Sequence, residues 1–99
     1  MVRIPLDQVR IAEFCRKRHI RRLALFGSVL RDDFGPESDV DVLVEFEPGH
    51  VPGLEFFAME IELSELLGRK VDLNTPGFLS PRFRSQVLAE AEVQYARPA

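Results

Sequence analysis

Two aspartates, Asp39 and Asp41, interrupt a valine-rich stretch of the sequence, DVDVLVEF. Aspartate is depleted in β-strands, so two of them in one predicted strand are unusual. Residues two apart in a strand share a face with Cα atoms roughly 6.6 Å apart, which lets both carboxylates converge on one point. Two negative charges at ~4 Å repel by about 4 kcal/mol at an effective dielectric constant of 20. Mg²⁺, which prefers carboxylate oxygens, would offset that repulsion, so the pair is a candidate metal site. The alternative interpretation is that both aspartates project into solvent from the edge of the sheet and bind nothing.

A second group of interest is Gly27-Ser28, at the junction between a predicted strand and a predicted short helix. Glycine lets a phosphate approach the backbone closely, and Ser28 offers a hydroxyl beside the N–H groups of a helix N-terminus. Arg31 follows one turn later and could add positive charge near the phosphates. The alternative is an ordinary helix N-cap, because serine is common there for backbone reasons.

A third carboxylate, Asp72, lies in the short predicted strand KVDLN. Val71 and Leu73 share one face of that strand and Asp72 takes the other. If this strand neighbours the Asp39 strand, three carboxylates come together and can hold two metal ions, an arrangement used in phosphoryl-type transfer. The order of residues along the chain leaves that adjacency open.

The elements that must position these residues are predicted to alternate between helix and strand. Asp7 is a suitable cap for the first helix, Gly68 ends the long one, and Ser80-Pro81 begins the last. The predicted order is helix 7–19, strand 22–26, short helix 28–33, strand 39–46, helix 54–67, strand 70–74 and helix 80–91, with 92–96 a short strand or a frayed tail. This order predicts a mixed α/β (α+β) fold, a small mixed sheet covered by helices, in a single domain over residues 1–99.

The predicted helix 54–67 carries two apolar rows on opposite sides. The first row is Leu54, Phe57, Ala58 and Ile61, and the second is Phe56, Met59, Leu63, Leu66 and Leu67. A helix that covers a sheet needs only one apolar face, so we expect the other to meet a second chain. We expect the second row to be that interface; the alternative is that the terminal helix folds over it.

Composition narrows the function classes. The 99 residues are 45% hydrophobic and carry a net charge of −3, which argues against a dedicated nucleic-acid binder. Cys15 is the only cysteine, which excludes an intramolecular disulfide and fits a core thiol. His19 and His50 have no partners at metal-ligand spacing and are expected at the surface. No signal peptide and no apolar run of about 20 residues is present, so we expect a cytoplasmic protein that does not span a membrane.

The stretch LFGSVLRDDFGPESDVDVLVEF resembles the signature of the DNA polymerase β-like nucleotidyltransferases: Gly-Ser, ten residues, then Asp-x-Asp. More narrowly, the chain is similar to the minimal nucleotidyltransferases, or MNT proteins, along essentially its whole length. The combined motif is far more specific than any of its parts. One departure is Asp32, where many members of the family have glycine after the arginine.

The resemblance implies an enzyme that transfers a nucleotide from a nucleoside triphosphate to an acceptor hydroxyl. It implies Mg²⁺ as the cofactor, with two ions expected, and the transfer of AMP from ATP as the expected reaction. It implies metal-binding catalytic carboxylates at Asp39, Asp41 and Asp72, of which Asp72 helps to activate the acceptor. It implies phosphate binding by Gly27 and Ser28, and it matches Arg31 to an arginine frequent in the family.

The resemblance also implies a partner. Many minimal nucleotidyltransferases are encoded beside a HEPN-domain protein, a small helical ribonuclease-type toxin, and act as its antitoxin; some transfer AMP to a tyrosine of the toxin. Two alternatives stay open: a binding module that neutralises its partner by occlusion, and an enzyme that modifies a small molecule, although such enzymes generally carry extra sequence for the acceptor. A homo-oligomer is a further option.

Overall fold

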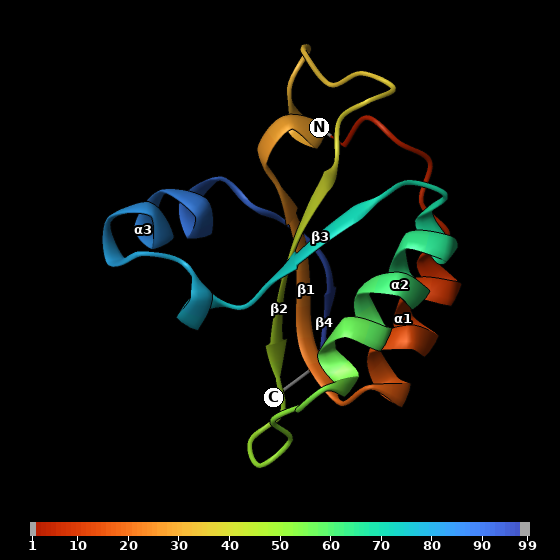
Figure 1. The fold of residues 1–99 in the computed structure, drawn as a ribbon, viewed down its shortest axis with the longest axis vertical. Coiled ribbons are helices and arrows are strands. Elements are labelled where there is room, and N and C mark those ends of the chain that lie inside the picture. Colours follow the sequence, from red (N-terminus) through yellow and green to blue (C-terminus); the bar gives the residue numbers. More distant parts are fainter. Residues whose placement is uncertain (1, 98–99) are drawn as a thin grey trace.

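The computed structural model describes residues 2–97 and consists of a four-stranded sheet with helices on both sides (Figure 1). Its elements are α1 (Gln8–Lys17), β1 (Ile20–Phe26), the 3₁₀ helix η1 (Gly27–Leu30), β2 (Val40–Phe46), α2 (Glu55–Leu67), β3 (Val71–Asn74), the 3₁₀ helix η2 (Pro76–Phe78), α3 (Pro81–Glu90) and β4 (Glu92–Ala96). The strand order is β3-β2-β1-β4. The predicted α+β class with a small mixed sheet is confirmed.

The register of the sheet shows which strand lies beside the strand of Asp72. β1 runs antiparallel to both β2 and β4, whereas β2 and β3 are parallel and joined through α2. In the β2–β3 pair Asp41 lies opposite Asp72, and in the β1–β2 pair Asp41 lies opposite Phe26. The strand of Asp72 therefore neighbours β2, which contains Asp41 and directly follows Asp39.

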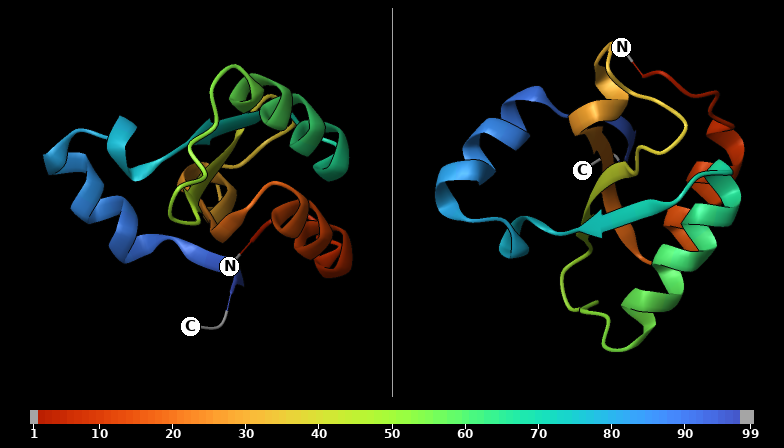
Figure 2. Two further views of the ribbon diagram at one scale, coloured as in Figure 1. Left: turned by 90° about the horizontal axis from the view of Figure 1, so that it is seen from below. Right: turned by 45° about the horizontal axis from the view of Figure 1, so that its top comes forward.

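One face of the sheet is the main hydrophobic core. Val40, Val42 and Val44 alternate onto it and are each fully buried. Helices α1 and α2 cover this face, as the view from below in Figure 2 shows, and contribute the buried side chains Phe14 and Leu63 among others. These strand residues are β-branched and apolar, which suits a pleated surface buried under helices.

The opposite face is covered only in part. Phe26 and Leu43 project onto it and pack against Leu79 and Val87, from the segment that leads into α3 and from α3 itself. α3 stands on the other side of the sheet from α1 and α2 in both views of Figure 2. Asp41, two residues before Leu43, belongs to this second face.

The prediction for the two rows of α2 is wrong in its choice of row. Met59 and Leu63, from the row expected at an interface, are 3% and 0% exposed and belong to the core. Phe57 and Ile61, from the other row, are 65% and 63% exposed. Because α3 lies on the far face of the sheet, it does not fold over α2.

Several local expectations are met with shifted boundaries. The Asp7 side chain accepts a hydrogen bond from the N–H of Arg10 and caps α1. Residues 92–96 form strand β4 rather than a frayed tail. Cys15 is buried in the core, and burial raises the pKa of its thiol to about 12. None of the helices within residues 2–97 combines the length and apolar character needed to cross a membrane.

Candidate active site

Asp41 lies at the centre of the candidate site. It sits in β2, between β1 and β3, with Asp72 as its register partner. Its pKa is raised above the ordinary value, first by desolvation and then by the negative charges of Asp72 and Asp39, while Arg31 acts in the opposite direction. A half-buried carboxylate flanked by two others has an unfavourable charged form, which is the property expected of a cation ligand.

Asp39 and Asp72 complete the group from more exposed positions. Asp39 directly precedes β2, and Asp72 is exposed on β3, at the edge of the sheet. Within residues 2–97, the carboxylate oxygens of the three aspartates do not all come within 4.8 Å of one another. The backbone thus gathers the three carboxylates in one region, and their oxygens stay spread around Asp41.

Only glycine suits position 27, because of its backbone conformation and the closeness of Asp41. Its φ of +76° lies in the left-handed region, which glycine adopts without a Cβ clash. A Cβ placed there would lie 2.2 Å from Oδ2 of Asp41. The glycine therefore lets the Asp41 carboxylate lie against the backbone at the end of β1, in the space that a side chain would fill.

Ser28 is not a helix cap. The N-cap of η1 is Phe26, which makes no side-chain cap hydrogen bond, and Ser28 lies inside the helix. Within residues 2–97 no hydrogen bond involves its hydroxyl group, while its carbonyl oxygen accepts from the N–H of Arg31 at 2.9 Å. The N-cap alternative is excluded, and the Ser28 hydroxyl stays available beside Gly27.

The positive side of the site is Arg31. Its guanidinium lies 3.6 Å from the carboxylate of Glu90 at the end of α3, and both side chains are about half exposed. The neighbouring Asp32, the departure from the family pattern, forms an ion pair with Arg3. The loop therefore accommodates aspartate at this position through a partner from the N-terminal segment.

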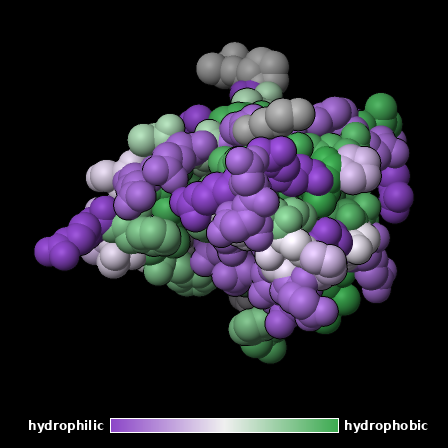
Figure 3. All heavy atoms as spheres, turned by 90° about the horizontal axis from the view of Figure 1, so that it is seen from above, coloured by the Kyte–Doolittle hydropathy of each residue, from purple (hydrophilic) through white to green (hydrophobic). Residues whose placement is uncertain are grey.

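Arg69 holds the loop that leads into Asp39, a role that the sequence did not reveal. Its guanidinium donates hydrogen bonds to the carbonyl oxygens of Gly35 and Ser38, the latter at 3.2 Å, and stacks over Phe34 at 4.5 Å. These contacts span more than 30 residues of sequence, so no local pattern signals them. Figure 3 views this end of the molecule, where hydrophilic side chains gather over the middle of the surface.

Comparison with known proteins gives concordant results. The family model described as a nucleotidyltransferase domain matches residues 9–93. A Methanocaldococcus jannaschii protein, named as a candidate protein adenylyltransferase, is 34% identical over 82 residues, which cover 83% of this chain and 87% of that protein. The protein adenylyltransferase MntA of Thermococcus cleftensis is 39% identical over 72 residues, covering 72% of this chain and 71% of the relative.

Comparison with solved structures gives the same family of proteins as the sequence comparisons do. A structure described as a candidate minimal nucleotidyltransferase superposes with a TM-score of 0.72 at 36% identity and covers 86% of each chain. A toxin–antitoxin complex with AMP-PNP contains a chain with a TM-score of 0.74 at 20% identity, covering 93% of this chain and 75% of that one, which shows the shared fold.

The chain belongs to the nucleotidyltransferase domain family. Within it, the resemblance to the minimal nucleotidyltransferases is confirmed, and the protein is a nucleotidyltransferase enzyme.

Proposed function

We propose that this enzyme transfers AMP from ATP to a hydroxyl group on a partner protein, with Asp39, Asp41 and Asp72 as its catalytic carboxylates. The observation that carries the proposal is the placement of Asp41 opposite Asp72 and against Gly27. The names of the relatives, which describe protein adenylyltransferases, support the reaction class. We further propose that residues 1–99 act as one minimal domain in the cytoplasm, where ATP is available.

The donor atoms fit Mg²⁺. All three candidates offer carboxylate oxygens, which are the ligands that Mg²⁺ prefers. The raised pKa of Asp41 has Asp72 and Asp39 among its causes, so the three charges act on one another and would be relieved by a shared cation. When bound, Mg²⁺ supplies positive charge for the oxygens that attack and leave the phosphorus atom.

The triphosphate would be held from the η1 side. Gly27 has no side chain and would let a phosphate reach the backbone beside Asp41, and Ser28 presents a hydroxyl that no other described residue engages. Arg31, whose positive charge opposes the rise in the pKa of Asp41, would add a guanidinium. These groups orient the α-phosphate toward the carboxylates.

The acceptor would enter beside Asp72, the exposed member of the three. Its carboxylate can accept the proton of the acceptor hydroxyl as that oxygen forms its bond to the α-phosphorus. The bond between the α-phosphorus and the bridging oxygen breaks, and pyrophosphate leaves. The products are the AMP-modified acceptor and pyrophosphate.

A HEPN-type protein is the proposed partner. One structural neighbour is described as a tri-AMPylated HEPN toxin of Shewanella oneidensis in complex with an MNT antitoxin. The exposed row of Leu54, Phe57 and Ile61, at 85%, 65% and 63% exposure, gives this chain an apolar surface of the kind that marks protein interfaces.

The test uses a HEPN-type candidate partner, sought first among the products of the genes that neighbour the gene for this chain. The two proteins are incubated with Mg²⁺ and ATP, GTP or CTP, and the partner is weighed by intact mass spectrometry. We expect the partner to gain one or more AMP groups, with ATP as the preferred donor. Loss of the partner's toxic activity with no change in its mass would contradict transfer and favour occlusion.

A further inference from the structure

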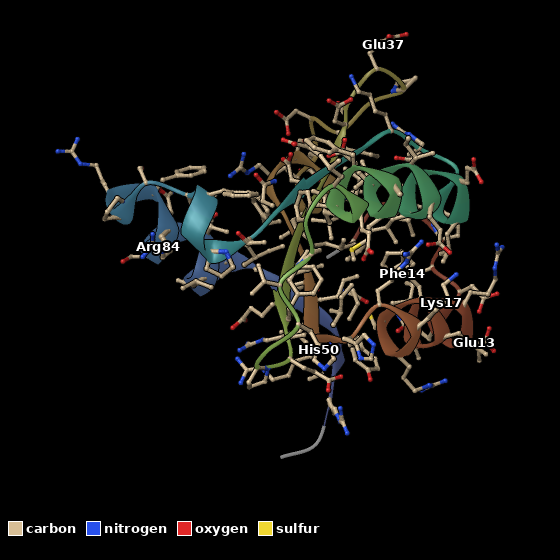
Figure 4. All side chains as sticks on the ribbon, turned by 60° about the horizontal axis from the view of Figure 1, so that its bottom comes forward. Glu13, Phe14, Lys17, Glu37, His50 and Arg84 are labelled. Carbon is tan, nitrogen blue, oxygen red and sulfur yellow. The ribbon has the colours of Figure 1, made fainter. Side chains whose placement is uncertain are left out.

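The two histidines of the chain meet at the end of the sheet opposite to the aspartates. His19 lies in the turn between α1 and β1, Glu47 directly follows β2, and His50 lies in the loop before α2. One ligand atom from each of the three residues lies within 4.8 Å of the other two. Figure 4 shows His50 at one end of the molecule and Glu37, in the loop before Asp39, at the other.

Backbone hydrogen bonds fix the three positions. The N–H of Glu47 donates to the carbonyl oxygen of His19 at 2.9 Å, and the N–H of His50 donates to the carbonyl oxygen of Glu47 at 3.0 Å. Pro48 and Gly49 occupy the centre of this tight turn, and Gly49 has a φ of +83°. Proline followed by glycine suits a type II turn, so the local sequence holds Glu47 and His50 side by side.

The side chains are free to reorganise toward a ligand. The imidazole rings stack with centroids 3.9 Å apart and planes at 11°, and both histidines are exposed. One carboxylate oxygen of Glu47, Oε1, pairs with Arg97, and within residues 2–97 the other oxygen, Oε2, has no hydrogen bond or ion pair. Ring nitrogens that lie in parallel planes must rotate about their side-chain torsions to point at one ion, and exposed side chains change rotamer at low cost.

We propose that His19, Glu47 and His50 bind a zinc ion. Two neutral imidazoles and one carboxylate form a donor set typical of Zn²⁺, whereas Mg²⁺ prefers oxygen ligands. Three protein ligands leave a coordination position for water. The bound ion connects the α1–β1 turn to the β2–α2 loop, so it stabilises the folded chain at a place remote from the carboxylates of the proposed active site.

The composition makes this site easy to isolate. Both histidines of the chain lie in it, so any imidazole signal reports on this site alone. The only cysteine, Cys15, is fully buried and cannot compete for the ion. Asp39 and Asp41 could bind zinc independently, so the titration is performed on the full chain with Asp39→Asn and Asp41→Asn.

Zinc titration by calorimetry on that background should give one ion per chain. His19→Ala and His50→Ala should each lower the affinity at least about tenfold, since each removes a ligand. Glu47→Gln should do the same, while Glu45→Gln should not. This control is matched, because Glu45 also pairs with arginines, Arg21 and Arg22, but lies outside the cluster.

Two further measurements decide between coordination and nonspecific binding. Co²⁺ in place of zinc should give the visible absorption of a four-coordinate ion, and zinc should raise the melting temperature; both effects should vanish in the double variant His19→Ala with His50→Ala. Equal zinc affinity in the double variant and its parent, or no zinc binding on the Asp39→Asn, Asp41→Asn background, would overturn the proposal.

Discussion

The two faces of strand β2 perform different tasks with alternate residues of one sequence. Val40, Val42 and Val44 project into the main core under α1 and α2, and all three are 0% exposed. Asp41, between the first two valines, projects onto the other face, where α3 contributes a small cluster and leaves the carboxylates accessible. The first face is filled with apolar side chains, and the second collects negative charge.

This difference shows how a chain of 99 residues accommodates an active site. A pleated strand separates stability from chemistry with a period of two, so acidic residues on one face need not disturb the packing of the other. The negative charge on the second face is energetically unfavourable, and this is reflected in the raised pKa of Asp41. Substitutions on the packed face should therefore lower stability, whereas substitutions of the aspartates on the charged face should lower activity and keep the fold.

The largest effect on stability is expected on the packed face. Met59→Glu places a charge where the side chain is 3% exposed, and we expect a loss of at least about 3 kcal/mol in unfolding free energy, measured by urea denaturation. Ile61→Glu, on the exposed row of the same helix, should change it by no more than about 0.5 kcal/mol and should weaken partner binding. Similar losses of stability in both would contradict the assignment of the two rows.

On the charged face, Asp41→Asn should abolish activity and keep the fold. We expect nucleotide transfer to fall about 1,000-fold or more, equivalent to about 4 kcal/mol, because a proposed metal ligand is lost. Urea denaturation should show unchanged or higher stability, since the substitution removes repulsion with Asp39 and Asp72. Asp33→Asn, in the exposed loop before β2, is the matched control and should keep full activity.

The junction between β1 and η1, beside Asp41, can be probed at Gly27. Gly27→Ala should lower stability by about 1 kcal/mol through its left-handed φ and should cut transfer severely, because the added Cβ displaces Asp41. Gly35→Ala is the control, since a Cβ there meets nothing within 4 Å. Ser28→Ala should weaken nucleotide use only partially. Mild and equal effects at Gly27 and Gly35, measured as KM and kcat for ATP, would contradict the phosphate-binding role.

The smallest effect concerns pH. The raised pKa of Asp41 means that the folded chain binds a proton at higher pH than the unfolded chain does. The contribution of Asp41 to stability should therefore become more favourable as pH falls through its raised pKa toward the ordinary value of 3.8. The stability advantage of Asp41→Asn over the parent should shrink across the same window in denaturation curves recorded as a function of pH. A gap that widens as pH falls would contradict the stated charge environment.

Much of this arrangement could be predicted from local patterns. The alternation of valine and aspartate in β2 and the Gly27-Ser28 junction indicated both the strand and its chemistry. Long-range contacts could not be read in this way: the pairing of Asp41 with Asp72 depends on a parallel register, and the contact of His19 with His50 depends on two separate turns. The choice between the apolar rows of α2 failed because both have similar hydrophobicity, and only the position of the helix on the sheet decides between them.

The most direct test of the central claim follows the two ends of ATP. The chain and its partner are incubated with Mg²⁺ and ATP labelled at either the α- or the γ-phosphate, for the parent and for Asp41→Asn. If the carboxylate face transfers a nucleotide, the parent places only the α-label on the partner and releases the γ-label as pyrophosphate, and Asp41→Asn does neither. Transfer of the γ-label to protein, or equal α-labelling by Asp41→Asn, would contradict the account.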